Sequence, residues 1–519
     1  MPFIKKHFLK IILLLVLLSA GTLCVYTTWE YGRNSASTQT KIESRHFTDN
    51  ERRHVFKAPD QAPRGQISDT NRRQRMPAGQ GMGQGNSRAG SGADYPVLVS
   101  SLAFFALFAA AYYHFVYRNT KIDPRQTGLI MLTLLLSGLF LRVFFSITTQ
   151  GHPFDINLFK NWAASAANNL FNFYSGPAAS DYPPLYIYIL FLIGKISSIP
   201  AVSPFLTSLI KLPSILADIA TSLVIYRLAK KYLTLEMSVL ASAFYIFNPA
   251  VIINSAIWGQ VDSFFALLVV SAVTLLSEKK SSCASSLFTA AVLMKPQGII
   301  FLPVLFFELI RRKNLKNFLK AGVSALITAV VIVLPFSLQQ DALWIFRLFS
   351  KTIAEYPYAS VNAFNFFSLI GKNYVPDTVN WLGLSLHHWG MIFIAAVTAF
   401  AWFIYIKGSS RAFASAAALL LIAGVFTFST SMHERYLFPA AALAILSFIY
   451  LGDKRLLLLS AGFSLTTYIN THVVLFATLK GVNAAQYSPL MVCTSLLNIF
   501  LFIYLAKVLA IHAGKRNTS

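Results

Sequence analysis

Long apolar segments recur along almost the whole chain, and short polar or basic stretches separate them. Several of these segments, such as residues 97–116, 128–145 and 206–228, approach or exceed about 18 residues, enough for a helix to cross a hydrocarbon core about 30 Å thick. A closed barrel would need alternating strands of about ten residues, and the sequence shows no such alternation. The sequence therefore predicts an all-α, polytopic integral membrane protein.

The composition fits this class. Of the 519 residues, 55% are hydrophobic and 12% are charged, less charge than a soluble domain carries. The formal charge of +24 would suggest nucleic acid in a soluble protein, but here the basic residues flank apolar spans, where they set topology. Cys24, Cys283 and Cys493 lie in or beside apolar segments and form neither a disulfide framework nor a metal-binding spacing.

The first 126 residues divide into three parts. Residues 1–28 place lysines before an apolar run, which is either a signal peptide or a first span, and the weak cleavage pattern favours an uncleaved membrane anchor. Residues 29–95 are polar and rich in Gly, Gln and Ser, so we expect an exported, disordered arm. An arm that binds anionic lipid or cell-wall polymer is the alternative. Residues 96–126 predict an extra transmembrane helix and a cytoplasmic turn.

Basic clusters predict the topology of the rest of the chain. If all of them face the cytoplasm, the chain has about fourteen spans and both ends inside, with residues 512–519 as a cytoplasmic tail. Of the apolar runs 185–193 and 206–228, only one can then cross. The first follows Pro183 and Pro184, so we expect it to lie along the outer surface as an interfacial helix. The clusters are Lys230–Lys231, Lys279–Lys280, Arg311 to Lys313, Lys407 to Arg411, Lys454–Arg455 and Lys515–Arg516.

Most candidate site residues fall on the outer face of this topology. Asp155 follows a span directly and starts a helical pattern, so it is either a general base above the lipid plane or a helix N-cap. His433 and Arg435 are suited to grip a phosphate. The other predicted substrate-binding residues are Asp181, Tyr182, Gln260, Asp262, Lys295, Gln297, Asn362 and Glu434.

Each of these residues also has a structural alternative, such as a helix cap, an ion pair or a rigid turn. Their convergence on one face favours a site, because charges near membrane helices are costly. Arg142 and Asp218 lie within spans instead, and we expect an ion pair inside the bundle. One His beside one Glu is a poor metal site, so we predict no metal and no cofactor, with a divalent cation as the open alternative.

The ordered motifs resemble a known family. Asp155 with Phe159 and Trp162, then Phe173-Tyr174, then Asp181-Tyr182-Pro183-Pro184, look like the first outer loop of GT-C glycosyltransferases. The likeness is greatest to bacterial mannosyltransferases related to GPI mannosyltransferase II. The stretches Asn248-Pro249, Trp258 to Ser263, Lys295 to Gln297 and His433 to Tyr436 fit the same family in the same order.

This resemblance implies a GT-C-type helical bundle over residues 127–511, with juxtamembrane helices in an extracytoplasmic first loop. It also implies a polyprenyl-phosphate-linked sugar donor and inversion at the sugar. By matching position, Asp155 would be the base. Arg435, His433 and Lys295 would be candidates for the donor phosphate, and Asp262, Gln260 and Asp181 would shape the sugar pocket. The stretch 258–263 has one acid rather than an acidic pair, which weakens any carry-over of metal dependence.

The leading hypothesis is therefore an integral-membrane glycosyltransferase, with mannose as the expected sugar, in a bacterial plasma membrane. Its acceptor would be a hydroxyl on a glycan, lipid or protein. A cytosolic nucleotide donor is unsupported, because no nucleotide-binding fingerprint is present. The alternatives are a transporter or flippase of lipid-linked sugars and a structural protein of the envelope. A transporter should carry repeats and polar residues near mid-membrane, whereas these groups gather mainly on one face.

Overall fold

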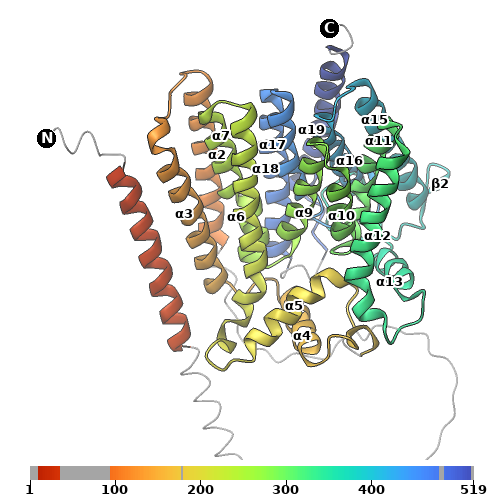
Figure 1. Cartoon of the computed structure of the whole chain (residues 1–519), viewed down its shortest axis with the longest axis horizontal. Coiled ribbons are helices and arrows are strands. Elements are labelled where there is room, and N and C mark those ends of the chain that lie inside the picture. The colour runs from red at the N-terminus through yellow and green to blue at the C-terminus, as the bar shows by residue number, and fades with distance from the viewer. Residues whose placement is uncertain (1–9, 35–93, 177–178, 479–483, 516–519) are drawn as a thin grey trace, which may run out of the picture.

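A computed structural model of the chain describes residues 10–34, 94–176, 179–478 and 484–515. Within these ranges the protein is a helical bundle with one small hairpin, in which β1 (Asn380–Trp381) pairs antiparallel with β2 (Leu384–Ser385). Figure 1 shows the long helices side by side, with the first loop's helices across one end. The prediction of an all-α membrane protein is confirmed for the part of the chain described.

The long helices are interrupted several times. Eight helices of the described ranges are long and apolar enough to cross a membrane, and five apolar helices are shorter. The predicted fourteen spans are therefore not reached by helix length alone. The elements that run along the bundle are the helix Lys10–Asn34, α2 (Asp94–Val116), α3 (Thr127–Thr148), α6 (Leu206–Tyr232), α7 (Leu235–Ile246), α8 (Pro249–Ile252), η5 (Ile253–Trp258), α9 (Asp262–Ser277), α10 (Ser281–Val292), α11 (Leu302–Arg312), α12 (Leu315–Ser337), α15 (Leu386–Lys407), α16 (Phe413–Phe428), α17 (Pro439–Leu451), α18 (Lys454–Ala477) and α19 (Pro489–Lys515).

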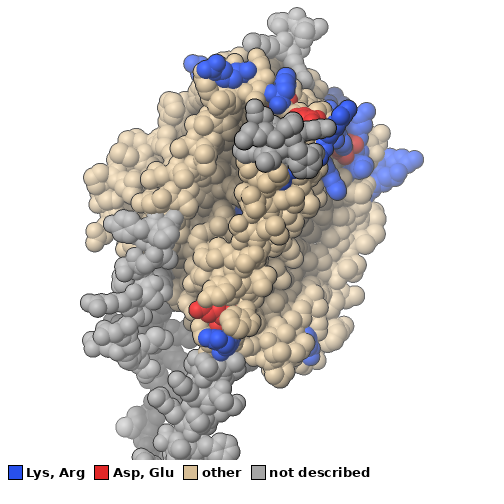
Figure 2. Space-filling model, turned by 90° about the vertical axis from the view of Figure 1, so that its left-hand side faces the viewer, with Lys and Arg blue, Asp and Glu red and all other residues tan. Residues whose placement is uncertain are grey.

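The basic clusters meet at one end of the bundle. Lys231 pairs with Glu278 at 2.8 Å, and the buried carboxylate of Glu308 accepts Arg312 at 2.5 Å and Arg411 at 2.8 Å. Figure 2 shows Lys and Arg gathered mostly at the top, away from α4 and α5, with smaller groups at the other end. This separation of the ends is the one that the basic clusters predicted.

The first loop forms two packed helices, α4 (Pro153–Asn168) and α5 (Pro184–Ser197). They lie across the end of the bundle in Figure 1, while α6 runs along it, as expected for the two apolar runs. Gly194 lies where they cross: a Cβ there would collide with the Ala163 carbonyl oxygen. The buried side chains of Phe159 and Tyr186 make an edge-to-face contact at 5.2 Å. This packing holds α4, which carries Asp155, against the bundle.

The helical segment 281–312 is broken near residues 294–298. Helix α10 ends at Val292, the short 3-10 helix η6 covers Pro296–Phe301, and α11 begins at Leu302. Lys295 lies between them in extended conformation (φ −149°). Such a break frees backbone groups and side chains at membrane depth. The long loop after α12 contains α13 (Trp344–Ile353) and α14 (Phe366–Leu369).

Two further predictions concern the span interiors and the N-terminus. Arg142 Nε donates to Asp218 Oδ2 at 2.8 Å with both side chains fully buried, so the predicted intrabundle ion pair is confirmed. The N-terminal helix continues to Asn34, beyond the anchor boundary predicted at residue 28. Residues 35–93, most of the predicted arm, lie outside the described residues, and the domain boundaries stay predictions.

Candidate functional site

A polar cavity of about 870 Å³ opens at the α4–α5 end of the bundle. It is enclosed by α4, the turn before α5, the break after α10, α13 and the segment between α16 and α17. Seven of the predicted site residues line it: Asp155, Asp181, Tyr182, Lys295, Gln297, His433 and Arg435. These residues are spread over 281 positions of the sequence, so the fold brings the predicted motifs to one place.

Asp155 is held by donors from the turn that follows η5. Its Oδ2 accepts hydrogen bonds from Trp258 Nε1 at 2.7 Å and from Gln260 Nε2 at 2.5 Å. The alternative of Asp155 as an N-cap is wrong. The cap of α4 is His152, whose Nδ1 accepts the Asp155 backbone N–H at 3.4 Å. The Asp155 side chain therefore points toward the turn at Trp258–Gln260 and into the cavity.

The electrostatics keep Asp155 ionised. Burial alone would raise the pKa of the Asp155 carboxyl, but the charges of Arg435 and His152 and the two side-chain hydrogen bonds outweigh burial and lower it. A carboxylate that is ionised at neutral pH is in the state that accepts a proton. The arrangement therefore suits a base.

Asp262 and Glu434 lie behind the cavity wall, where they bind the two cations that face it. Lys295 Nζ pairs with Asp262 Oδ1, and Arg435 Nε lies 3.7 Å from Asp262 Oδ2. Arg435 Nη1 also donates to Glu434 Oε1 at 2.5 Å. Neither acid lines the cavity. Each contacts a cation that does, and their contact with substrate stays a prediction.

Of three other predicted residues, His433 lines the cavity, whereas Gln260 and Asn362 do not. Burial and the neighbouring Arg435 hold the pKa of His433 well below its ordinary value, so the neutral ring offers a hydrogen bond rather than a charge. Gln260 holds Asp155 and does not line the cavity. Asn362 is a support residue: its backbone O accepts Asn470 Nδ2 at 2.7 Å and its Oδ1 accepts the Ala485 N–H at 2.7 Å.

A second acid pair, Asp181 and Glu355, also lines the cavity. Asp181 and Glu355 share a side-chain hydrogen bond, and Thr352 Oγ1 donates to the Asp181 carbonyl at 2.7 Å. Burial and the Asp181 carboxylate raise the pKa of Glu355 to about 7. Burial also raises the pKa of Asp181. This pair therefore holds a proton near neutral pH.

This proton gives a testable pH dependence. Between pH 5 and 7 the folded state binds more protons at Glu355 than the unfolded state, so stability falls as pH rises through this window and levels off above it. Glu355 is exposed, and screening keeps the effect below about 1 kcal/mol. We expect the melting temperature of Glu355→Gln to fall less between pH 5 and 8 than that of the wild type. Equal pH dependence in the two proteins would contradict the shared proton.

Helix α13 contributes cavity residues that the sequence prediction did not include. Arg347 and Lys351, one helical turn apart, line the cavity with Trp344 and Leu348. The basic residues of this loop were visible in the sequence, but no pattern placed their helix beside Asp181. The contact depends on the tertiary fold.

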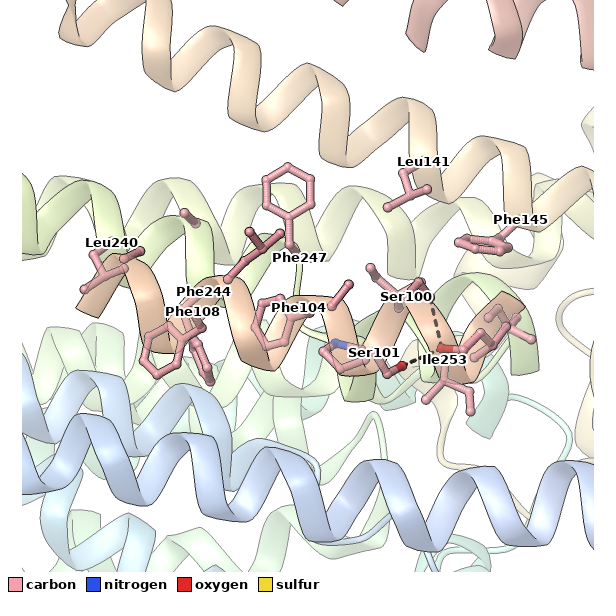
Figure 3. Close-up of a pocket in the computed structure, with 18 residues that line it drawn as sticks. Ser100, Ser101, Phe104, Phe108, Leu141, Phe145, Leu240, Phe244, Phe247 and Ile253 are labelled. Carbon is pink, nitrogen blue, oxygen red and sulfur yellow. Dashed lines mark hydrogen bonds between the residues drawn. The ribbon is translucent and has the colours of Figure 1, made fainter. Parts of the chain in front are cut away.

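An apolar pocket lies elsewhere, between α2, α3, α7 and η5 (Figure 3). It encloses about 400 Å³. The hydroxyls of Ser100 and Ser101, which line it, are bonded to the Val97 carbonyl at 2.9 and 2.6 Å. The pocket therefore presents hydrocarbon, and we assign no chemistry to it. Among the residues described, no group of three or more His, Cys, Asp or Glu side chains could hold a metal ion.

One family model matches the middle of the chain. The model of Glycosyltransferase family 87 matches residues 182–431. This segment includes the 258–263 turn and Lys295, while Asp155 and the segment 433–435 lie outside it. The comparison with curated proteins found no match.

One solved structure is similar over much of the chain. It is the crystal structure of the Archaeoglobus fulgidus oligosaccharyltransferase tethered to an acceptor peptide with an NVT sequon. The identity is 15% and the TM-score is 0.35, over 76% of this chain and 56% of that one. The chain thus spans about half the length of that enzyme, and at this TM-score the two folds are not shown to be the same.

Proposed function

We propose that this chain is a membrane glycosyltransferase that moves a sugar from a polyprenyl-phosphate donor to an acceptor hydroxyl, and the match of its middle part to the family 87 model supports this class. The reaction takes place at the extracytoplasmic face, with Asp155 as the general base. The sugar is mannose and its configuration is inverted, as the motif resemblance implies. The location is a bacterial plasma membrane.

One observation carries this proposal: a carboxylate held ionised by two hydrogen-bond donors lies in the same cavity as two cations. Asp155 supplies the base, while Lys295 and Arg435 face the cavity with carboxylates behind them. Transfer from a phosphate donor needs a base for the acceptor hydroxyl and positive charge for the leaving phosphate. The cavity offers both.

The reaction then proceeds as a direct displacement. The acceptor oxygen attacks the anomeric carbon of the sugar, and its proton passes to the Asp155 carboxylate. The bond between that carbon and the phosphate oxygen breaks, and polyprenyl phosphate leaves as an anion that Lys295 and Arg435 stabilise. A single displacement inverts the anomeric configuration. Leaving-group protonation is less needed, because the phosphate is already a stable anion.

The cavity adjoins a place for the donor's tail. An apolar groove of about 670 Å³ runs between α10, α12 and α13, and Ser350 lines both groove and cavity. Helix α13 presents Phe346 and Phe349 to the groove and Arg347 and Lys351 to the cavity. A prenyl chain gains about 0.8 kcal/mol per CH₂ by staying in apolar surroundings, so this junction suits a ligand with a polar head and a long tail.

Filling the groove should affect long-chain donors selectively. Val330 lines the groove and is 46% exposed, so Val330→Trp adds bulk without rebuilding the core. We expect a KM at least about fivefold higher for a long-chain donor and little change for a short-chain donor. Val331→Trp, at a neighbouring position that is 65% exposed and does not line the groove, is the matched control. Equal effects of the two variants would contradict the groove's role.

We also propose more membrane spans than the eight helices that qualify by length. Counting the short helices α9, α10, α16 and α17, together with α18 and the η6–α11 unit, as spans beside the eight long ones brings the number to fourteen. Short helices can cross when they are buried inside a bundle. All residues of α16 from Phe413 to Thr427 are buried. We propose a GT-C-type bundle with both ends in the cytoplasm.

A transfer assay with purified protein tests the function. Polyprenyl-phosphate mannose and polyprenyl-phosphate glucose would be offered with glycan and lipid acceptors, and product would be identified by mass spectrometry. Transfer of mannose with an inverted linkage is the expected result. Movement of intact donor across vesicles without sugar transfer would overturn the enzyme and favour a flippase. Transfer from polyprenyl-phosphate glucose but not from polyprenyl-phosphate mannose would overturn the proposed sugar and leave the proposed enzyme class standing.

A further inference from the structure

Helix α6 carries a polar stripe deep within its span. Lys211, Ser214 and Asp218 follow one another at spacings of three and four residues, which places them on one face of the helix. Their side chains are buried, with residue exposures of 0, 3 and 0%. Polar groups inside membrane spans are costly and mark function by default. None of these three residues has a role in the proposed transfer reaction.

Lys211, the first residue of the stripe, binds the chain segment that precedes Asp155. Lys211 Nζ donates to the Thr149 carbonyl at 2.7 Å, to Thr149 Oγ1 at 3.0 Å and to the Ser146 carbonyl at 3.3 Å. These groups form the end of α3, immediately before His152 and α4. The Lys211 side chain thus fixes the segment that leads into α4 and Asp155.

The other two members hold the turn that supplies Asp155's donors. Ser214 Oγ donates to the Gln260 carbonyl at 2.7 Å. Asp218 Oδ2 accepts Ser255 Oγ at 2.6 Å and Arg142 Nε at 2.8 Å. Ser255 lies in η5, a π-helix, and π-helices are frequent at functional sites.

The turn itself has little freedom. Gly259 has φ +89°, and a Cβ there would approach Ile156 Cδ1 to 2.6 Å. The N–H groups of Gly259 and Gln260 both bond to the Asn254 carbonyl, at 3.1 and 3.0 Å. Anchors on either side of this tight turn therefore determine where the Trp258 and Gln260 side chains point.

We propose that the α6 stripe of Lys211, Ser214 and Asp218 is a positioning device that sets Trp258 and Gln260 against the Asp155 carboxylate. These are positioning residues: they touch the segments around Asp155 and not the reacting atoms. The inference rests on the proposed function for the catalytic part of its effect. The contacts reach the end of α3, η5 and the turn at Gln260, which are the segments that adjoin His152 and supply the donors to Asp155.

The chain offers a matched control on the same helix. Ser222 is also fully buried, and its hydroxyl bonds to the Ser242 carbonyl at 3.1 Å and to Ser242 Oγ at 2.8 Å. It joins α6 to α7, away from the turn. Ser214→Ala and Ser222→Ala thus remove the same group at similar burial, and only the first should affect Asp155.

The test compares the two variants in kinetics. We expect Ser214→Ala to lower kcat by about tenfold or more, because small misplacements of catalytic groups are costly, with the donor KM within about twofold of wild type. The acidic limb of its kcat/KM profile should move to higher pH, since weaker bonds from Trp258 and Gln260 favour protonated Asp155. Ser222→Ala should show neither change. Ser214→Thr, which restores a hydroxyl, should recover activity.

Hydrogen exchange tests the positioning without any reaction. Peptides covering residues 255–262 should exchange faster in Ser214→Ala than in Ser222→Ala. Equal exchange and equal kinetics in the two variants would overturn the proposal. If Ser214→Ala exchanges faster than Ser222→Ala but the wild type is inactive in every transfer assay, the positioning role is kept and the proposed function is rejected, so the two failures are distinguishable.

Discussion

Asp155→Asn should lower kcat by about 10²- to 10⁴-fold, the contribution expected of a general base. The asparagine side chain has the same shape and keeps one oxygen for Trp258 Nε1 and Gln260 Nε2, which both bond to Asp155 Oδ2. The variant therefore loses proton acceptance while the hydrogen bonds around it survive. Initial rates with saturating donor, beside a melting curve of each protein, measure the effect.

Asp181→Asn is the matched control for this prediction. Asp181 is a carboxyl of the same cavity, but burial raises its pKa and it shares a hydrogen bond with Glu355, so the pair already holds a proton near neutral pH. We expect its kcat to fall by about tenfold at most. Full activity in Asp155→Asn with a large loss in Asp181→Asn would move the base to Asp181.

The wild-type pH profile gives an independent check on the base. The pKa of Asp155 lies below its ordinary value, so protonation of this residue should not reduce kcat/KM anywhere between pH 5 and 8. A limb near pH 7 that disappears in Glu355→Gln would belong to the Asp181–Glu355 pair, because the pKa of Glu355 is about 7. A limb near pH 6 that survives in Glu355→Gln and vanishes in Asp155→Asn would contradict the ionised base.

The fold was predictable from the sequence where length and charge decide it. Apolar length marked the spans, and the basic clusters set which ends meet, as the Lys231–Glu278 and Arg411–Glu308 pairs show. The helix break at Lys295 coincides with Pro296 and Gly298 in the sequence. The boundaries and the number of helices were harder to predict. The short helix α17 and the polar residues of α18 are stabilised by tertiary contacts, which no local sequence pattern indicates.

The candidate site was predictable as a set of motifs but not as a geometry. Asp155, Lys295 and Arg435 were found because charged groups at span ends are unusual. Their division into groups that face the cavity and groups that stand behind it, such as Asp262 and Glu434, depends on tertiary packing. Ser214 and Lys211 gave a signal, polar residues spaced along one face of a span, which the search for outer-face groups overlooked.

Arg435→Gln should lower kcat/KM by about 10²- to 10³-fold, the loss seen when one preorganised group that stabilises developing charge is removed. Arg435 faces the cavity and stays positively charged. Burial disfavours its ionised form, but Glu434, Asp155 and Asp262 keep the pKa of Arg435 well above the usual range. We expect most of the loss in kcat, because the phosphate gains charge as the sugar leaves.

The single variant also leaves Glu434, which is 3% exposed, without its cation, and this alone is destabilising. The double variant Glu434→Gln/Arg435→Gln removes both charges and separates the two effects. If Arg435 stabilises the leaving phosphate, the double variant regains its melting temperature and stays about as inactive as the single one. If activity returns with stability, Arg435 serves only to balance Glu434, and Lys295 alone is left to bind the phosphate.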